Sequence, residues 1–196
     1  MSTADDVAAA FLDALGPMTA KKLEKLVYYA QAWHLAWHSR PLFDEEIQAW
    51  REGPVVKQLY DRHRGRRVVT EWSFGSAAAL TDEDRVTVAW VVDKYGAFTA
   101  EALSRMTHND VPWLIAREGL PPDAASDRPI RPQDMAAFYA RQQADAETAV
   151  QLSSASAGLE GVEFDAEWQS KLRDVADGKV GADAVIHEEI ERSLRE

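Results

Sequence analysis

The chain has 196 residues, of which 46% are hydrophobic and 28% charged, a composition typical of a folded globular protein. It contains no cysteine, which excludes disulfides, thiol catalysis and cysteine-bound metals. The formal net charge is −11, and an acidic chain is a poor ligand for phosphate backbones. We therefore expect a protein partner with a basic surface and no binding to nucleic acid.

The sequence also argues against a membrane protein. No run of apolar residues is long enough to span a bilayer. The N-terminal stretch MSTADDVAAAFLDAL lacks the basic region that begins a secretory signal. Together with the absence of cysteine, this leads us to expect a cytoplasmic protein.

Helix-capping residues and apolar spacing predict helices over the first forty residues. Asp5 or Asp6 is expected to cap a first helix that ends at Gly16-Pro17. Thr19 is expected to cap a long second helix, whose apolar residues recur three and four positions apart. This helix should stop near Ser39, because a proline follows.

The middle of the chain mixes short irregular segments with further helices. Residues 41–56 are predicted to be irregular or briefly extended, with Pro54 in the first turn of the next helix. Residues 68–70 are predicted to form a brief strand or a packed loop. The later helices are predicted to begin at capping or proline residues: Thr81, Thr99, Asp110 and Pro132.

Large apolar residues become scarce after residue 140, which predicts the end of the compact domain there. Two short amphipathic helices are expected further on, one capped by Asp165 and one near the C-terminus. Such a pair buries too little apolar surface to be stable alone and should need a partner surface. The predicted fold is therefore all-α, with a compact helical domain over residues 1–140 and a small three-helix segment over residues 141–196.

The histidines do not form a recognisable metal site. His34 and His38 share one helix face, but stable zinc sites need three or four ligands and no third one is near in sequence. His34 is therefore expected to be a hydrogen-bonded core residue. His63 is assigned to the solvated basic end of a helix within Asp61–Arg67, and His108 to a hydrogen-bonded helix end.

No catalytic or cofactor motif stands out either. The sequence contains no nucleophile elbow, glycine-rich phosphate loop or calcium-binding loop. The three acids at 44–46 are interpreted as solvated surface rather than as an acid–base pair. We therefore expect neither enzymatic activity nor a cofactor, with a hydrolase using His108 or these acids as the least favoured alternative.

The stretch KKLEKLVYYAQAWHLAWHSRPLFDEEIQAWREGPVVKQLY, residues 21–60, resembles the Panacea domain of toxin–antitoxin systems. The resemblance extends over about residues 5–140 and implies an all-α domain with a neutralising role, without naming the toxin. It is carried by these elements: Lys22, Leu26 and Tyr28 leading to Ala30-Gln31, then Pro41-Leu42-Phe43, Ala49-Trp50, Gly53-Pro54-Val55, Leu59-Tyr60, Thr107-His108 and Pro112-Trp113.

Residues 150–196 resemble the small VbhA-type antitoxins that inhibit Fic-domain toxins, which transfer AMP from ATP to proteins. The inhibitory motif of that family, (S/T)-x-x-x-E-(G/N), reads here from Ser156 through Glu160 to Gly161. The bare pattern is short, and an ordinary helix with a C-terminal glycine is the competing interpretation. The amphipathic segments that follow it in the same order as in the small antitoxins favour the resemblance.

The resemblance implies a mechanism of inhibition. Ser156 and Glu160 would lie on one helical face, and Gly161 would end the helix where the acid projects. The glutamate would pair with a toxin arginine that otherwise holds the ATP γ-phosphate, because carboxylate and phosphate are alternative partners of a guanidinium. Apolar side chains would hold most of the affinity for the toxin: Leu159, Trp168, Leu172, Val175, Val185, Ile186 and Ile190.

A second interpretation keeps the Panacea-like domain as the functional part. In it, the protein is an antitoxin or a proteolytic adaptor that acts on an unrelated toxin. The segment after residue 140 would then be an interaction or degradation arm. The two interpretations differ in the partner, because only a Fic-domain protein carries the motif His-x-Phe-x-(Asp/Glu)-Gly-Asn-Gly-Arg-x-x-Arg.

Overall fold

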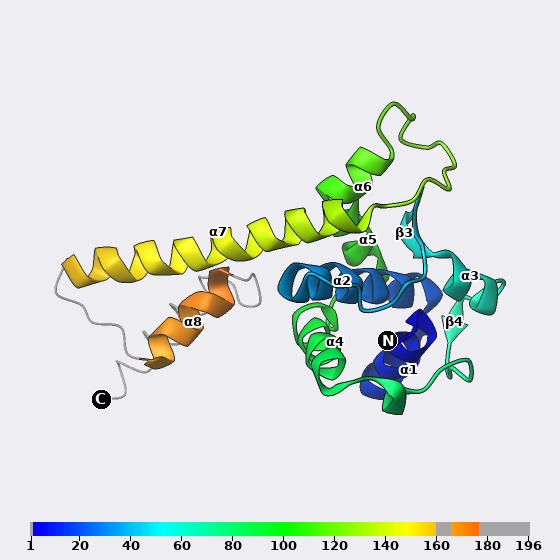
Figure 1. Ribbon diagram of the computed structural model, residues 1–196, viewed down its shortest axis with the longest axis horizontal. Helices are drawn as coiled ribbons and strands as arrows, with labels where there is room; N and C mark the ends of the chain where they lie inside the picture. The colour runs from blue at the N-terminus through cyan, green and yellow to red at the C-terminus, as the bar shows by residue number, and fades with distance from the viewer. Residues whose placement is uncertain (1, 160–165, 177–196) are drawn as a thin grey trace. The chain divides into compact units, whose positions relative to one another are not determined.

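The structure is a computed structural model that describes residues 2–159 and 166–176 (Figure 1). Within these residues it is mostly helical, with two small two-stranded antiparallel sheets, which confirms the predicted fold class. The contacts within the chain divide it into two units, Met1–Ala140 and Arg141–Glu196. None of the helices in the described residues combines the length and hydropathy needed to cross a membrane.

The first helix, α1 (Ala4–Leu15), begins two or three residues earlier than a cap at Asp5 or Asp6 would place it. Its cap is Thr3, whose hydroxyl accepts a hydrogen bond from the backbone N–H of Asp6 at 3.2 Å. The Asp6 carboxylate in turn accepts from the backbone N–H of Thr3 at 3.0 Å, so the two residues form a capping box. The prediction that Asp5 or Asp6 caps α1 is therefore wrong, because Asp6 occupies the third helical position of this motif.

The second helix, α2 (Ala20–His38), is the centre of the first unit. Thr19 caps it and it ends at Ser39, as predicted, and Ser39 adopts a left-handed conformation. Residues from Leu23 to Leu35 are buried on every side of the helix, because α1, α3, α4, α5 and strand β3 all pack against it (Figure 1). A helix buried all round must hold its polar side chains inside the core, and this determines the site described below.

Strands β2 (Ile47–Trp50) and β3 (Gly53–Val56) form a hairpin in which Ala49 lies opposite Pro54. Residues 51 and 52 make its two-residue turn. Pro54 is thus in a strand, and the expectation that it begins the next helix is wrong. That helix, α3 (Lys57–His63), starts three residues later. Pro54 lacks an N–H group, but its carbonyl oxygen is used by a buried lysine of α2.

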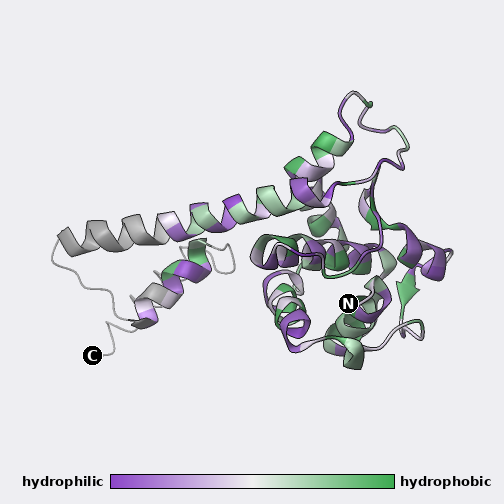
Figure 2. Ribbon diagram, in the orientation of Figure 1, coloured by the Kyte–Doolittle hydropathy of each residue, from purple (hydrophilic) through white to green (hydrophobic). Residues whose placement is uncertain are grey.

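The segment after α3 returns to the start of the chain. Strand β4 (Val68–Val69) pairs antiparallel with β1 (Met18–Thr19), which confirms the brief strand expected there. A short 3-10 helix, η1 (Ala77–Ala79), then packs against α1. Figure 2 shows the alternation along this segment, with a hydrophilic α3 followed by a hydrophobic β4.

Three predicted caps are found at the later helices. Thr81 and Thr99 accept N-terminal hydrogen bonds of α4 (Asp82–Tyr95) and α5 (Ala100–His108). Asp110 precedes α6 (Val111–Ala116), which carries Pro112 in its first turn. Helix α7 (Pro132–Leu159) follows a proline-rich loop and begins at Pro132, as predicted. The last helix in the described residues is α8 (Ala166–Ala176).

The buried core of α2 provides a direct test of this arrangement. Replacing Leu26, which has no exposed surface, with Ala should lower the free energy of unfolding by about 3 kcal/mol, because the cavity cannot fully collapse. Val86→Ala is the control on α4, since its side chain is 67% exposed and its loss should change stability by less than about 0.5 kcal/mol. Urea unfolding followed by tryptophan fluorescence measures both changes. Equal effects of the two substitutions would contradict the central position of α2.

Candidate functional site

Glu24 ties the hairpin and α3 to the central helix. Its Oε2 accepts a hydrogen bond from the backbone N–H of Val56 at 2.8 Å, and its Oε1 lies 2.7 Å from Nε2 of His63. The side chains of Glu24 and His63 are both buried. The assignment of His63 to a solvated basic helix end is therefore wrong, because a buried carboxylate needs partners and the imidazole supplies one.

Lys25, the next residue of α2, is fully buried beneath the hairpin. Its ammonium group donates to the carbonyl oxygen of Pro54 at 2.8 Å. Burial lowers the pKa of Lys25 to about 7, and the nearby carboxylates of Glu24 and Glu52 offset only part of this effect. Between about pH 7 and pH 10.5, the Lys25 amine is therefore mostly neutral in the folded chain and mostly protonated in the unfolded chain.

The hairpin turn passes so close to Lys25 that it needs a glycine. Gly53 has a φ of +104°, a value that other residues rarely adopt. A Cβ at this position would lie 2.6 Å from Cε of Lys25 and 2.9 Å from the hydroxyl oxygen of Thr107 on α5. Gly53, Pro54 and Thr107, all quoted above for the Panacea resemblance, therefore meet at one buried amine.

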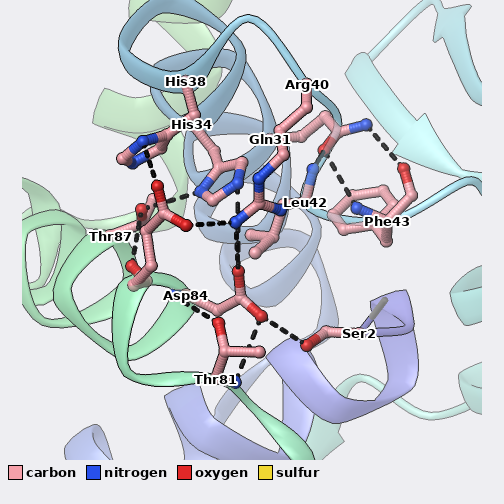
Figure 3. Close-up of polar contacts among 11 residues, drawn as sticks. Ser2, Gln31, His34, His38, Arg40, Leu42, Phe43, Thr81, Asp84 and Thr87 are labelled. Carbon is pink, nitrogen blue, oxygen red and sulfur yellow. Dashed lines mark hydrogen bonds and ion pairs between the residues drawn. The ribbon is translucent and has the colours of Figure 1, made fainter.

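Gln31 holds the segment between α2 and the hairpin. Its side-chain oxygen accepts from the backbone N–H groups of Leu42 and Phe43 at 2.8 and 3.3 Å. Its side-chain nitrogen donates to the carbonyl oxygen of Phe43 at 2.8 Å, as seen in Figure 3. One amide thereby satisfies three backbone groups that would otherwise be buried without partners.

His34 is buried, as predicted, and its Nδ1 lies 2.9 Å from the hydroxyl of Thr87 on α4 (Figure 3). The pKa of His34 is lowered to about 4, mainly by burial and in smaller part by the neighbouring His38 and Arg40. Its Nε2 lies 3.8 Å from Oδ1 of Asp84, too far for a hydrogen bond. At neutral pH, His34 is therefore an uncharged residue of the core.

The order of Thr87, His34 and Asp84 resembles a nucleophile, base and acid, but it does not form a catalytic site. All three are at most 1% exposed, so a substrate has no access to the hydroxyl. Asp84 is instead held by Ser2, whose hydroxyl donates to its Oδ2 at 2.7 Å. Within the described parts of the chain, no group of three or more His, Asp or Glu side chains is placed to hold a metal ion.

A second cluster lies where α5 and α6 meet the hairpin. The ring of His108 stacks on Trp113 with centroids 4.4 Å apart, and burial lowers its pKa. The prediction of a hydrogen-bonded helix end is wrong for its Nε2, which is buried and has no hydrogen-bond partner among the described residues. Trp113 donates through Nε1 to the carbonyl oxygen of Trp50 at 3.0 Å and lies under the guanidinium of Arg117. His108 is thus paired with an aromatic ring rather than with a nucleophile.

The start of α7 is joined to this cluster by a buried hydrogen bond. The hydroxyl of Tyr139 donates to Oδ2 of Asp110 at 2.6 Å. Burial raises the pKa of Asp110 to about 6, although the hydrogen bond from Tyr139 acts in the opposite direction. Met135 and Tyr139 are both at most 1% exposed, so this part of α7 belongs to the core of the first unit.

The predicted inhibitory motif is only partly within the described residues. Ser156 and Leu159 are in α7, whose described part ends at Leu159. Glu160 and Gly161 lie outside the described residues, as do Val185, Ile186 and Ile190. The helical position of Ser156 agrees with the expected motif, while the relation of Ser156 to Glu160 stays a prediction.

The other predicted partner-binding residues lie on α8. Trp168, Leu172 and Val175 occur at helical spacing and are half-buried. On the same helix, Nζ of Lys171 lies 3.2 Å from Glu167 and 5.7 Å from the centre of the Trp168 ring. These contacts describe an amphipathic helix, and they do not identify what its apolar face binds.

The buried contacts define a helical domain built around α2, a central helix that carries several buried polar side chains. Residues 23–114, from α2 to α6, match a family model described as "Antitoxin SocA-like, Panacea domain". This match supports the Panacea resemblance within that range, and it does not extend to residues 150–196. No curated protein and no solved structure matches the chain.

The sequence signalled only part of this site. Glu24 and Lys25 stand among charged residues at the start of α2, where a solvated end is the ordinary interpretation. Their partners are the carbonyl of Pro54, the N–H of Val56 and His63, all about thirty or more residues away. The available signal was that apolar residues surround them on every side of the helix.

The lowered pKa of Lys25 predicts how stability changes with pH. Between about pH 7 and 10.5 the unfolded chain binds this proton and the folded chain does not. The free energy of unfolding should therefore rise with pH in this window, by up to about 1.4 kcal/mol per pH unit from this group. Lys25→Met should remove that rise, whereas Lys21→Met at the half-buried start of the helix should retain it. Urea unfolding at several pH values measures the slope, and an unchanged slope in Lys25→Met would contradict the burial of the amine.

Proposed function

We propose that this protein is an antitoxin that neutralises a Fic-domain toxin, an enzyme that transfers AMP from ATP to proteins. The observation that carries the antitoxin class is the match of residues 23–114 to the SocA-like Panacea family. The identity of the toxin rests on the sequence from Ser156 to Gly161 and on the amphipathic segments after it. The protein acts in this proposal by binding and not by catalysis.

Competition for one anion site explains the inhibition. The Glu160 carboxylate occupies the place of the ATP γ-phosphate and pairs with an arginine of the toxin. ATP then binds without the contact that aligns it for transfer, and poor alignment alone slows a reaction by large factors. Ser156, which is on α7, anchors the motif by a hydrogen bond to the toxin.

The segment after the motif supplies affinity. Trp168, Leu172 and Val175 are spaced to present one apolar face of α8 to a toxin groove. Val185, Ile186 and Ile190 extend this apolar set in the sequence. The net charge of −6 over residues 151–196 favours a basic toxin surface, because opposite charges accelerate and orient association.

The alternative is an antitoxin or proteolytic adaptor for an unrelated toxin. It is favoured by the extent of the family match, which covers residues 23–114 and leaves residues 150–196 out. Affinity purification from the native host, with mass spectrometry of the partner, distinguishes the two. A partner with the Fic motif supports the first function, and a partner without it supports the alternative.

Replacing Glu160 tests whether the residue that inhibits the toxin differs from the residues that bind it. Glu160→Gly should leave complex formation with the Fic-domain partner within about threefold of the parent protein, because the apolar anchors remain. The same substitution should restore AMP transfer, measured with labelled ATP and a protein acceptor, because the arginine becomes free for the γ-phosphate. Glu163→Gly is the matched control and should still inhibit. Full inhibition by Glu160→Gly would disprove the competition mechanism.

A truncated chain tests which of the two units binds the toxin. A chain truncated after Asp145 keeps the core contacts of Met135 and Tyr139, so its circular dichroism should still show a folded helical protein. It should lose detectable binding to the Fic-domain partner, measured by isothermal titration calorimetry. Retained binding would mean that the Panacea-matching unit is the neutraliser, as in the alternative.

A further inference from the structure

An open groove with a volume of about 690 Å³ lies beside the hairpin turn in the first unit. One wall is formed by Trp50, Arg51 and Glu52 of the hairpin, and the other by Asp123, Ala125, Ser126 and Asp127 of the loop. Trp50 is half-buried, with its ring held edge-on to Tyr60 at a centroid distance of 4.5 Å. The groove therefore combines a fixed aromatic surface with a carboxylate-bearing loop.

A buried arginine holds the loop wall in place. The guanidinium of Arg117, which is 5% exposed, donates to the carbonyl oxygen of Ala124 at 2.7 Å and to those of Pro121 and Pro122 at 3.3 Å. It also donates to the carbonyl oxygen of Ala49 on β2 at 3.0 Å. One side chain thus fixes the loop to the strand that carries Trp50, and a wall fixed in advance loses little entropy when a ligand binds.

The far end of the loop is tied to the same strand by its backbone. The N–H of Ala49 donates to the carbonyl oxygen of Arg128 at 2.8 Å, and the N–H of Ile130 donates to that of Ile47 at 2.8 Å. Asp123 and Asp127 lie between Pro122, whose carbonyl is bound by Arg117, and Arg128, whose carbonyl is bound by Ala49. Their backbone positions are therefore set by the fold of the domain and not by a ligand.

The charges of the groove are unbalanced. Glu52 is paired with Lys21 and Arg51, each at 3.3 Å. Asp123 and Asp127 are exposed and, within the described residues, make no ion pair or side-chain hydrogen bond. Two unpaired carboxylates facing an aromatic surface attract a cation with an apolar stem, and they repel phosphates.

We propose that this groove is a docking site for a basic segment of a partner protein, with an arginine or lysine side chain placed between Trp50 and the carboxylates of Asp123 and Asp127. The methylene stem of such a side chain packs on the indole while its charged end reaches the carboxylates. The overall net charge of −11 supports a basic partner in the same way.

An exposed apolar face on helix α6 favours a protein partner over a free polyamine. Helix α6 is joined to the hairpin by the hydrogen bond between Trp113 and Trp50. Its residues Val111, Leu114 and Ile115 share the side of the helix opposite Trp113 and are 44%, 48% and 42% exposed. A protein that places a basic segment in the groove can also cover such a surface, whereas a polyamine cannot.

The proposal rests on the proposed function only in expecting a protein partner, and its test does not involve Glu160. The full-length chain is titrated into a fluorescein-labelled peptide of alternating leucine and arginine at low salt, with fluorescence anisotropy as the readout. We expect saturable binding that weakens about fivefold in the variant Asp123→Asn/Asp127→Asn, because two exposed charge pairs are lost. The control Asp13→Asn/Glu101→Gln removes the same net charge from exposed residues of α1 and α5 and should bind as the parent does.

Four results would overturn the proposal. The first is the absence of saturable binding up to millimolar peptide. The second is equal weakening in the two double variants, which would show attraction to net charge alone. The third is binding of spermidine as tight as that of the peptide, which would identify a polyamine site. Ala125→Arg, which places a cation in the groove, is expected to abolish peptide binding, and unchanged binding in it would also contradict the proposal.

Discussion

The polar side chains buried in α2 constrain the rest of the first unit. Glu24, Lys25, Gln31 and His34 lie inside a helix that is covered on all sides. A buried polar group without a hydrogen bond costs about 1–3 kcal/mol, so each of these residues requires a neighbour at a defined position. The hairpin, α3, the segment after Ser39 and α4 each supply one of those neighbours. The positions of these elements therefore follow from the need to give each buried polar side chain of α2 a hydrogen-bond partner.

The same logic extends from the core to the surface. The hairpin held by Lys25 carries Trp50 and Ala49, and these residues accept the hydrogen bonds of Trp113 and Arg117. Arg117 then fixes the proline-rich loop whose acids border the groove. A surface of defined shape is thus connected to the centre of the domain through a short series of buried hydrogen bonds. This makes it better suited to specific binding than a flexible acidic loop would be.

The functions proposed for the two units rest on different observations. The match to the SocA-like Panacea family concerns residues 23–114, which include the buried polar residues of α2. The proposed Fic-inhibiting role concerns residues 150–196 and rests on the sequence motif from Ser156 to Gly161. The groove beside Asp123 and Asp127 belongs to the first unit, and the basic segment proposed to bind there is independent of this motif.

The sequence by itself determined the features that depend on neighbouring residues. Thr19, Thr81 and Thr99 identify their helix starts, because a capping hydroxyl bonds to an N–H only three residues away. Only the tertiary structure decided that Pro54 is in a strand, that His63 is buried against Glu24, and that Arg117 organises a groove. Those outcomes depend on partners far apart in the chain, such as Arg117 and Ala49, and on the cost of leaving buried polar groups unpaired. A local sequence pattern cannot predict such a pairing, because the two residues come together only when the helices pack.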